Sequence, residues 1–428
     1  MLKRETVHLN DTERRVLESI DTDAMLEYLR ELVSIPSHGG RESAAQRSVA
    51  SKLGELRLDI DVWDLDFESL RGHPGFSMSI QREEGLGVVG TLKGGEGGRS
   101  LIFNGHIDTV APGEEENWSF PPLVGTVADG RIYGRGVADM KGGLCCAIYA
   151  AKAIIDAGVR LKGDLSIQSV IGEEDGGVGA LSTVLRGHTA DAAVVMEPTE
   201  VKIAPAHSGA LAFTVEVPGR SAHACVREEG VSAIEKFIAL FNALRNLETE
   251  RNRGINDPLY ARYGTPYPIN VGTVQGGNWP GSVPESLVFQ GRVGVVVGEK
   301  VEDARKSVEN AIAKAADADP WLKENPPRLE WSGYQFDSAS IETTHPIVEE
   351  VQKAYNDATG EPAKLEGMTY ASDMRHLVKT GGVPTVLFGP GDVRQAHAPD
   401  EYVEIGELVI AARVLALTAL RFCGYEEP

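Results

Sequence analysis

The order of apolar segments changes between residues 209 and 338 and then returns to its earlier form. Within this stretch, alternating apolar runs typical of strands and helix-spaced apolar residues follow one another as strand, helix, strand, strand, helix, strand. That order is the β-α-β-β-α-β arrangement of ferredoxin-like folds, and its length is typical of a domain with its own core. We therefore expect 209–338 to be a domain inserted into a larger one, which consists of 1–208 and 339–428.

The two flanking segments alternate strands with helices. Strand-like apolar runs occur at LGVVGTLKG, SLIFNGHID, DLSIQSVIG, AAVVMEP and VPTVLFGPG, and helical patterns include KGGLCCAIYAAKAIIDA. Alternation of this kind is typical of a layered α/β domain with a mostly parallel sheet. The first two runs are joined by GGEGG, which lacks the GK[ST] ending of a phosphate-binding loop. We therefore expect a simple hairpin connection there.

Length and charge restrict the class of protein. At 428 residues, the chain exceeds what one hydrophobic core usually supports. Its 63 acidic residues outnumber 42 basic ones and give a net charge of -21, which repels nucleic acid and anionic membranes. We find no apolar stretch near the roughly 18 residues of a membrane span and no signal-peptide core, and we expect a cytoplasmic protein. The four cysteines lack CxxC spacing, which favours reduced structural thiols.

Four strand-like runs of the flanking domain lead into side chains that can bind a metal ion. These side chains are His106 and Asp108 after the first run, Glu173, Glu174 and Asp175 after the second, Glu197 after the third and His397 after the fourth. Asp139 lies among glycines between the first two groups. The carboxyl ends of parallel strands meet at one edge of a sheet, where ligands bind. We therefore expect all of these side chains to form one cluster.

Imidazoles and carboxylates without thiolates are ligands for zinc, cobalt or manganese. Two histidines and three ligand carboxylates are too many for one tetrahedral ion, but they fit two ions that share a carboxylate. Such a pair lowers the pKa of a water towards about 7 and polarises a carbonyl group, as amide hydrolysis requires. The doublet Glu173-Glu174 could supply one ligand and one general base. Each signal alone is more often a surface feature, and their shared position at strand ends is what favours a site.

Five segments, NGHIDTV, GRGVADMKGG, GEED, MEPT and HAPDEYV, resemble in the same order the motifs of one metallopeptidase family. This is the acetylornithine deacetylase, succinyl-diaminopimelate desuccinylase and carboxypeptidase G family, whose members carry an inserted lid domain. The resemblance implies an α/β zinc-exopeptidase-like catalytic domain and a homodimer formed through the lid. It also implies two divalent ions, with zinc expected and cobalt or manganese as alternatives.

The resemblance assigns a role to each residue of the cluster. Asp139 would bridge the two ions, His106 and Glu197 would complete one site, and Glu174 and His397 would complete the other. Glu173 would be the general base and acid. Asp108 would accept a hydrogen bond from the far nitrogen of His106 and so fix its ring. The peptide bond between Asp139 and Met140 would be cis.

Three residues of the inserted domain also match family segments. PGRSAHAC implies that His223 reaches across a dimer to stabilise the oxyanion in the partner's site. GGNWPGSVPE and FQGRVG imply that Asn278 and Arg292 bind a substrate carboxylate, for which a guanidinium group offers bidentate geometry. Without the resemblance, His223 would be interpreted as a helix cap. For Arg292, the alternative is a solvated strand residue.

Two segments depart from the family pattern. AHSGAL has Ser208 where relatives of similar length often show an arginine, and GMTYASDMRHL replaces a more glycine-rich loop. We therefore expect His207, Asp373 and Arg375 to line the pocket, and the substrate to differ from those of the named enzymes.

The leading hypothesis is a metal-dependent amidohydrolase that acts on a small carboxylate-bearing N-acyl amino acid or peptide. One alternative in the same fold is a single-metal aminohydrolase or deformylase that acts on a ring C–N bond or a formamide. Another alternative is a non-catalytic metal-binding homologue. The presence of Glu173, a base that binds no metal, argues against this last alternative.

Overall fold

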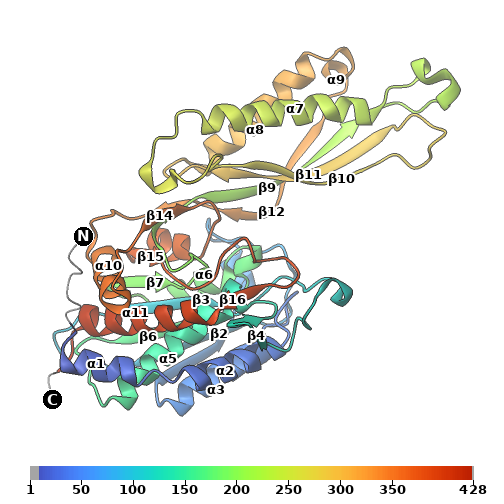
Figure 1. Ribbon diagram of the computed structural model, residues 1–428. Coiled ribbons are helices and arrows are strands. Elements are labelled where there is room, and N and C mark those ends of the chain that lie inside the picture. The colour runs from blue at the N-terminus through green and yellow to red at the C-terminus, as the bar shows by residue number, and fades with distance from the viewer. Residues whose placement is uncertain (1–8, 427–428) are drawn as a thin grey trace. The chain divides into compact units, whose positions relative to one another are not determined.

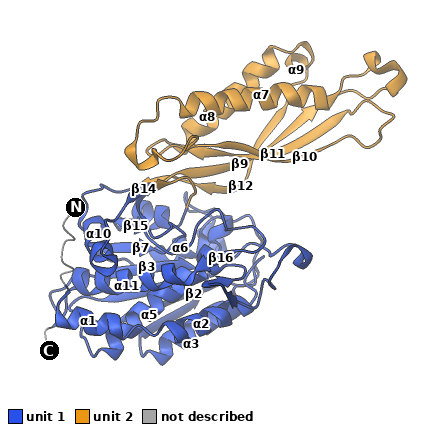
Figure 2. Cartoon of the chain, in the orientation of Figure 1, with its two compact units in different colours: residues 1–206, 340–366, 372–428 blue, residues 207–339, 367–371 orange. Residues whose placement is uncertain are grey.

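The structure is a computed structural model that describes residues 9–426, and it forms two compact units (Figures 1 and 2). The first unit contains the residues up to 206, residues 340–366 and the residues from 372 onward. The second contains residues 207–339 and 367–371. The predicted boundaries, at 208/209 and 338/339, differ slightly from these breaks, and no sequence signal indicated the short segment 367–371. Within residues 9–426, every helix is too short or too polar to span a lipid bilayer.

A nine-stranded mixed sheet organises the first unit (Figure 1). Its central strands run parallel in the order β6 (Leu165–Val170), β3 (Leu101–His106), β7 (Ala192–Val195) and β15 (Thr385–Leu387). The remaining strands are β2 (Leu86–Leu92) and β1 (Asp59–Asp64) beyond β6, and β8 (Ile203–His207), β13 (Ala339–Ser340) and β14 (Leu365–Met368) beyond β15. Every residue of β3 is buried, as is typical of a parallel strand covered on both faces. The mostly parallel α/β architecture is confirmed.

The hairpin predicted at GGEGG is wrong. β6 lies between β2 and β3, pairing antiparallel with β2 and parallel with β3. Strands two positions apart in a sheet are separated by only about 10 Å, which the connection 93–100 spans easily. The sequence around this turn contains no sign of the intervening strand, because that strand comes from a distant part of the chain.

Helices pack against this sheet. The helices α5 (Gly142–Asp156) and α11 (Ile405–Cys423) pack against each other and against β3, whereas α3 (Ser43–Glu55) and α6 (Val178–Leu185) pack against β2 and β6. The other helices of this unit are α1 (Asp11–Glu18), α2 (Thr22–Ser34), α4 (Phe67–Leu70) and α10 (Pro346–Thr359). A small three-stranded sheet consists of β4 (Thr126–Ala128), β5 (Arg131–Tyr133) and β16 (Tyr402–Glu404).

Close packing brings the start of α5 to the end of β7. A Cβ atom placed on Gly143 would lie 2.2 Å from the backbone oxygen of Met196, a separation that no side chain could tolerate. The small residues at the start of α5 therefore let this helix approach the sheet where the predicted metal ligand Glu197 leaves it.

The second unit has the predicted β-α-β-β-α-β order. Its elements are β9 (Gly209–Pro218), α7 (Ala233–Asn252), β10 (Ile269–Gly276), β11 (Ser286–Val295), α8 (Val301–Asp317), α9 (Pro320–Glu324) and β12 (Arg328–Phe336). The strands form an antiparallel sheet in the order β10-β11-β9-β12. The alternating residues Leu211, Phe213, Val215 and Val217 of β9 belong to the core that this unit forms with residues of α7 and α8. The ferredoxin-like fold is therefore confirmed.

Candidate metal centre

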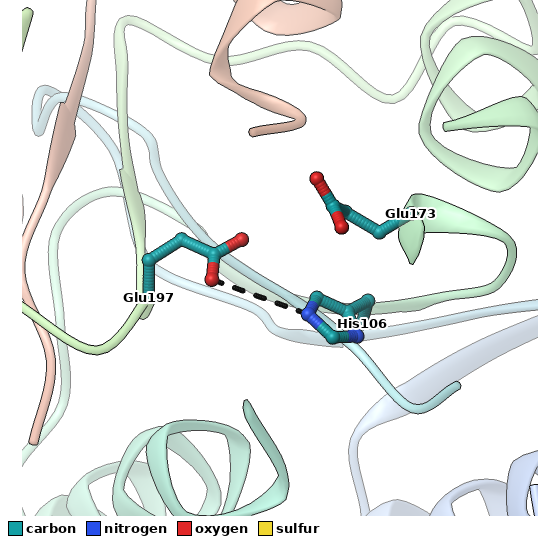
Figure 3. A group of neighbouring side chains, drawn as sticks. All are labelled: His106, Glu173 and Glu197. Carbon is teal, nitrogen blue, oxygen red and sulfur yellow. Dashed lines mark ion pairs between the residues drawn. The ribbon is translucent and has the colours of Figure 1, made fainter. Parts of the chain in front are cut away.

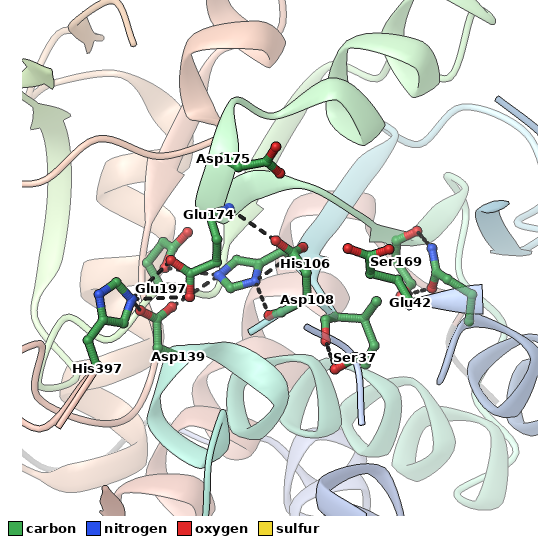
Figure 4. Close-up of polar contacts among 12 residues, drawn as sticks. Ser37, Glu42, His106, Asp108, Asp139, Ser169, Glu174, Asp175, Glu197 and His397 are labelled. Carbon is green, nitrogen blue, oxygen red and sulfur yellow. Dashed lines mark hydrogen bonds and ion pairs between the residues drawn. The ribbon is translucent and has the colours of Figure 1, made fainter. Parts of the chain in front are cut away.

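Strand ends bring the predicted cluster together. His106 is the last residue of β3, the turn η3 (Glu173–Asp175) follows β6, and Glu197 follows β7. Because these three strands are neighbours and run parallel, their carboxyl ends lie at one edge of the sheet. Asp139, in the segment η2 (Val137–Lys141), and His397, in the loop after β15, complete the group (Figure 4).

The side chains form two groups. Within each group, the potential ligand atoms all lie within 4.8 Å of one another. One group contains His106, Glu173 and Glu197 (Figure 3), and the other contains Asp139, Glu174 and His397 (Figure 4). The structure therefore brings together all five predicted ligands, with Glu173 beside them.

Asp139 contacts both histidines. Its Oδ1 lies 3.0 Å from His106 Nε2, and its Oδ2 lies 3.4 Å from His397 Nε2. His106 Nε2 is also 4.0 Å from Glu197 Oε2, and His397 Nε2 is 2.9 Å from Glu174 Oε2. The peptide bond after Asp139 is cis, as predicted. One carboxylate therefore connects the two groups of potential ligands.

The electrostatics of the cluster are those of a cation site. Burial, together with the charges of neighbouring carboxylates, raises the pKa of Glu173, Glu174 and Glu197. Hydrogen bonds to Asp139 and Glu174 raise the pKa of His397 to about 10. Glu197 Oε1 is buried and has no hydrogen-bond partner among residues 9–426. Crowded, buried carboxylates repel one another unless positive charge lies between them. Their oxygens, together with two imidazole nitrogens, fit zinc, cobalt or manganese.

Asp108 orients its neighbours differently from the prediction. His106 Nδ1 lies 2.9 Å from the backbone oxygen of Asp108, but 3.6 Å from its carboxylate Oδ1. The backbone carbonyl, and not the predicted carboxylate, therefore accepts the Nδ1–H and leaves Nε2 available to a metal ion. The carboxylate Oδ2 instead accepts a hydrogen bond of 3.0 Å from the backbone N–H of Glu174. The Asp108 side chain thus connects the ends of β3 and β6.

A buried ion network that we did not predict from the sequence holds the η3 turn. Arg82 donates two hydrogen bonds to the Asp175 carboxylate, of 3.0 and 2.7 Å, and two to Glu42 Oε1, of 3.2 and 2.9 Å. The side chains of all three residues are at most 3% exposed. Neither Arg82 nor Glu42 lies in a recognisable motif, so only Asp175, within GEED, had a sequence signal.

Glu401 was also missed. Its carboxylate accepts hydrogen bonds from Arg135 Nη1 at 2.6 Å and from the backbone N–H groups of Ala138 and Asp139 at 3.0 and 3.2 Å. The carboxylate therefore fixes the backbone that carries the predicted bridging aspartate. Its sequence signal was its position in HAPDE, the segment that also contains the predicted ligand His397.

The inserted domain carries the three remaining predicted residues, which we describe within that unit alone. His223 is exposed and caps the turn η4 (Ala224–Glu229), because its Nδ1 accepts a hydrogen bond of 3.1 Å from the backbone N–H of Cys225. Asn278 is exposed between β10 and β11. Arg292 lies in β11, and its Nε and Nη2 have no hydrogen-bond partner in the described part of the chain.

The three residues predicted to line the pocket fall in different units. His207 is buried at the end of β8, belongs to the second unit, and its Nδ1 lies 2.8 Å from the Ser208 carbonyl. Asp373 and Arg375 belong to the first unit. Arg375 Nη2 donates to the backbone oxygen of Gly176, next to the η3 turn.

An α/β sheet that gathers histidines and carboxylates at one edge, with an inserted ferredoxin-like domain, defines a class of metal-dependent hydrolases that act on C–N bonds. A family model described as Peptidase family M20/M25/M40 matches residues 102–421, and the chain belongs to this family. Membership identifies the protein as a hydrolase of amide C–N bonds, as predicted, in place of the non-catalytic alternative.

Two curated relatives have the same name, N-formyl-4-amino-5-aminomethyl-2-methylpyrimidine deformylase. The protein from Halalkalibacterium halodurans is 33% identical over 91% of this chain and 91% of its own length. The protein from Bacillus subtilis is 29% identical over 89% of each. Among solved structures, the dipeptidase Dug1p from Saccharomyces cerevisiae superposes with a TM-score of 0.76 at 13% identity and covers 97% of this chain and 99% of its own. This last likeness concerns the fold alone.

The buried ion network gives a stability prediction. Replacing Arg82 with Met leaves Glu42 and Asp175 buried without their counter-charge, and should lower the free energy of unfolding by about 3–5 kcal/mol in denaturant melts followed by circular dichroism. Arg186→Met is the matched control, because Arg186 makes the same two-bond contact with Asp61 at a solvent-exposed position. We expect little change for this control. Equal losses in the two variants would contradict the importance of the buried network.

Proposed function

We propose that the protein is a dinuclear metal-dependent deformylase that hydrolyses the formamide of a small aminopyrimidine. The observation that supports this most strongly is the similarity to two relatives named as such deformylases, which extends over 91% and 89% of the chain. The proposed activity is therefore the deformylase alternative from the sequence analysis, and not its leading hypothesis. The two ligand groups favour two ions over one.

The proposed ligands are the five residues of the cluster, with Asp139 shared between the ions, His106 and Glu197 on one side and Glu174 and His397 on the other. Zinc is the first candidate, because its usual ligands in catalytic sites include imidazole and carboxylate groups. Bound there, divalent ions would polarise the formyl carbonyl and lower the pKa of the attacking water towards about 7. The backbone carbonyl of Asp108 keeps His106 in the tautomer that binds.

The position of Glu173 supports the proposal that it is the general base. Its carboxylate lies with His106 and Glu197 (Figure 3), and in this proposal Asp139, which contacts both histidines, is the shared ligand in place of Glu173. In the proposed reaction it takes a proton from the attacking water and returns it to the amine nitrogen as the N–C bond breaks. The products are formate and a primary amine.

A second candidate is the amidohydrolase of N-acyl amino acids, which was the leading hypothesis from the sequence. Arg292 on β11 supports this candidate, because two of its guanidinium nitrogens have no hydrogen-bond partner within residues 9–426 and could bind a substrate carboxylate. Asn278, in the segment before β11, is the second residue proposed to bind that carboxylate. A panel of N-formyl, N-acetyl and N-succinyl substrates with zinc, cobalt and manganese separates the two candidates. Cleavage of the acyl amino acids alone would exclude the deformylase.

The base assignment gives the first test. We expect Glu173→Gln to keep both ions and to lose at least about 10²-fold in the rate of formamide hydrolysis, because the amide cannot accept the proton. The rate is measured as formate release, and metal content by mass spectrometry. Glu96→Gln, at an exposed position, is the control and should have the wild-type rate. Full activity of Glu173→Gln would exclude its role as the base.

The number of ions gives the second test. After saturation with zinc and dialysis, we expect two ions per wild-type chain and about one in His397→Ala, because that substitution removes a ligand from only one of the two groups. His188→Ala is the control, since His188 contacts Asp61 and Trp63, away from the cluster, and it should retain two ions. A wild-type protein that saturates with one ion would support the single-metal alternative.

We further propose that the protein is a homodimer formed through the inserted domain, with a cytoplasmic location as predicted from the sequence. β10 is an edge strand of the sheet, and Val274 on it and Ile238 on α7 are 48% and 52% exposed. Edge strands and exposed apolar side chains are typical of an interface. His223 fits its proposed role across this dimer, because capping uses Nδ1 as an acceptor and leaves Nε2–H as a donor for an oxyanion.

The dimer gives the third test. We expect the wild-type protein to sediment as a dimer and Ile238→Lys/Val274→Lys as a monomer that keeps both ions but loses activity, because His223 could no longer reach a partner. Val127→Lys, which replaces an exposed apolar residue of the first unit, is the control and should remain dimeric. A monomeric wild-type protein with full activity would contradict both the dimer and the role of His223.

A further inference from the structure

The carboxyl group of Asp373 is buried and makes no hydrogen bond within the described chain. The residue is 1% exposed, and neither of its carboxyl oxygens has a hydrogen-bond partner among residues 9–426. A buried carboxyl group without a hydrogen-bond partner is unfavourable, because burial removes its hydration without replacing the lost hydrogen bonds. A hydrogen-bonding ligand would remove this penalty.

Asp373 lies beside the metal centre. A Cβ atom placed on Gly177, in the turn that follows Glu173 and Glu174, would lie 2.4 Å from Asp373 Oδ1. The charge of Asp373 also raises the pKa of Glu173 and Glu197, to which burial contributes most. Asp373 nevertheless belongs to neither group of potential metal ligands. The carboxyl group of Asp373 therefore lies next to the metal centre but is not one of its potential ligands.

The surroundings restrict what Asp373 can bind. Charges of both signs act on this region. Arg375 and His106 lower the pKa of Asp373, whereas Asp108 raises it, and Asp373 itself raises the pKa of Glu173 and Glu197. The acidic groups outnumber the basic ones, so an additional substrate carboxylate next to Asp373 would be unfavourable. A group that donates hydrogen bonds is preferred instead. Burial raises the pKa of Asp373 to about 7, so its two oxygens can act as two acceptors or as one acceptor and one donor near neutral pH.

An amino group next to a ring nitrogen matches both oxygens at once. In a 4-aminopyrimidine, the exocyclic N–H donates to one oxygen, and the adjacent ring nitrogen shares a proton with the other. Asn and Gln side chains bind adenine in a comparable way, with one hydrogen bond to its amino group N6 and one to a ring nitrogen, N7. Peptide and N-acyl amino acid substrates lack such an edge.

We propose that Asp373 is a specificity-determining residue that binds the amino group and the neighbouring ring nitrogen of an aminopyrimidine and holds its formamide at the metal centre. This inference rests on the proposed deformylase function and adds the residue that recognises the ring. Gly177 contributes by leaving room for the carboxyl, since any side chain there would collide with Oδ1.

The test compares two formamides in the zinc-loaded enzyme. The first is N-formyl-4-amino-5-aminomethyl-2-methylpyrimidine, and the second is N-formylbenzylamine, whose ring has neither the amino group nor a nitrogen. We expect Asp373→Leu to lower kcat/KM for the first by at least about 10²-fold, and to change the second by less than about threefold. The ratio of the two values is independent of how much of the variant is folded, because both substrates report on the same active molecules.

Asp373→Asn separates recognition from structure. Asn retains one acceptor and one donor, so we expect it to restore most of the preference for the aminopyrimidine that Leu loses. Asp64→Leu, the same exchange on an exposed residue of β1, is the matched control and should leave the ratio unchanged. Metal content measured for each variant shows whether the centre is intact.

The outcomes distinguish this inference from the proposed function. If wild-type enzyme cleaves formamides but Asp373→Leu lowers both substrates equally, or neither, the inference is wrong and the deformylase stands. If the wild-type enzyme cleaves neither formamide, the proposed function is wrong. In that case, calorimetric binding of 4-amino-5-aminomethyl-2-methylpyrimidine decides the inference: binding that Asp373→Leu abolishes supports ring recognition, and absence of binding excludes it.

Discussion

Repulsion among buried carboxylates is the constraint on which the arrangement of the first unit depends. Asp108, Asp139, Glu173, Glu174 and Glu197 meet at one edge of a sheet, together with the imidazole rings of His106 and His397. No apolar packing could stabilise such a group, because each charge loses its hydration when it is buried. The parallel strands β3, β6 and β7 force these side chains together, and a cationic cofactor is the natural compensation.

A second layer of contacts holds this unfavourable group in place. Arg82 fixes the turn after β6 through Asp175, and Glu401 fixes the backbone before Asp139. Both contacts join segments that are far apart in the sequence, and both are buried. The Asp108 carboxylate connects two strand ends directly. Breaking these charged networks would cost free energy, because their groups are buried. The geometry of the centre should therefore change little when ligands bind.

Sequence patterns could predict what depends on short stretches of chain. Strand-end residues such as His106 and Glu197 were identifiable because a buried strand leads directly into each, and the order of elements indicated the inserted domain. The hairpin at GGEGG was predicted wrongly because β6, which separates β2 from β3, comes much later in the chain. Arg82 and Glu401 were missed for the same reason: their partners become neighbours only through the tertiary fold. The contact of His106 with a backbone carbonyl, and not with the Asp108 carboxylate, depends on turn geometry that residue types do not specify.

The two histidines differ greatly in their access to solvent. The side chain of His106 is 1% exposed, whereas that of His397 is 52% exposed. An ion held by the buried histidine would exchange slowly with the medium, whereas one held by the open histidine would equilibrate quickly with whichever metal is abundant. If two ions bind as proposed, the one held by His397 would be the more easily replaced.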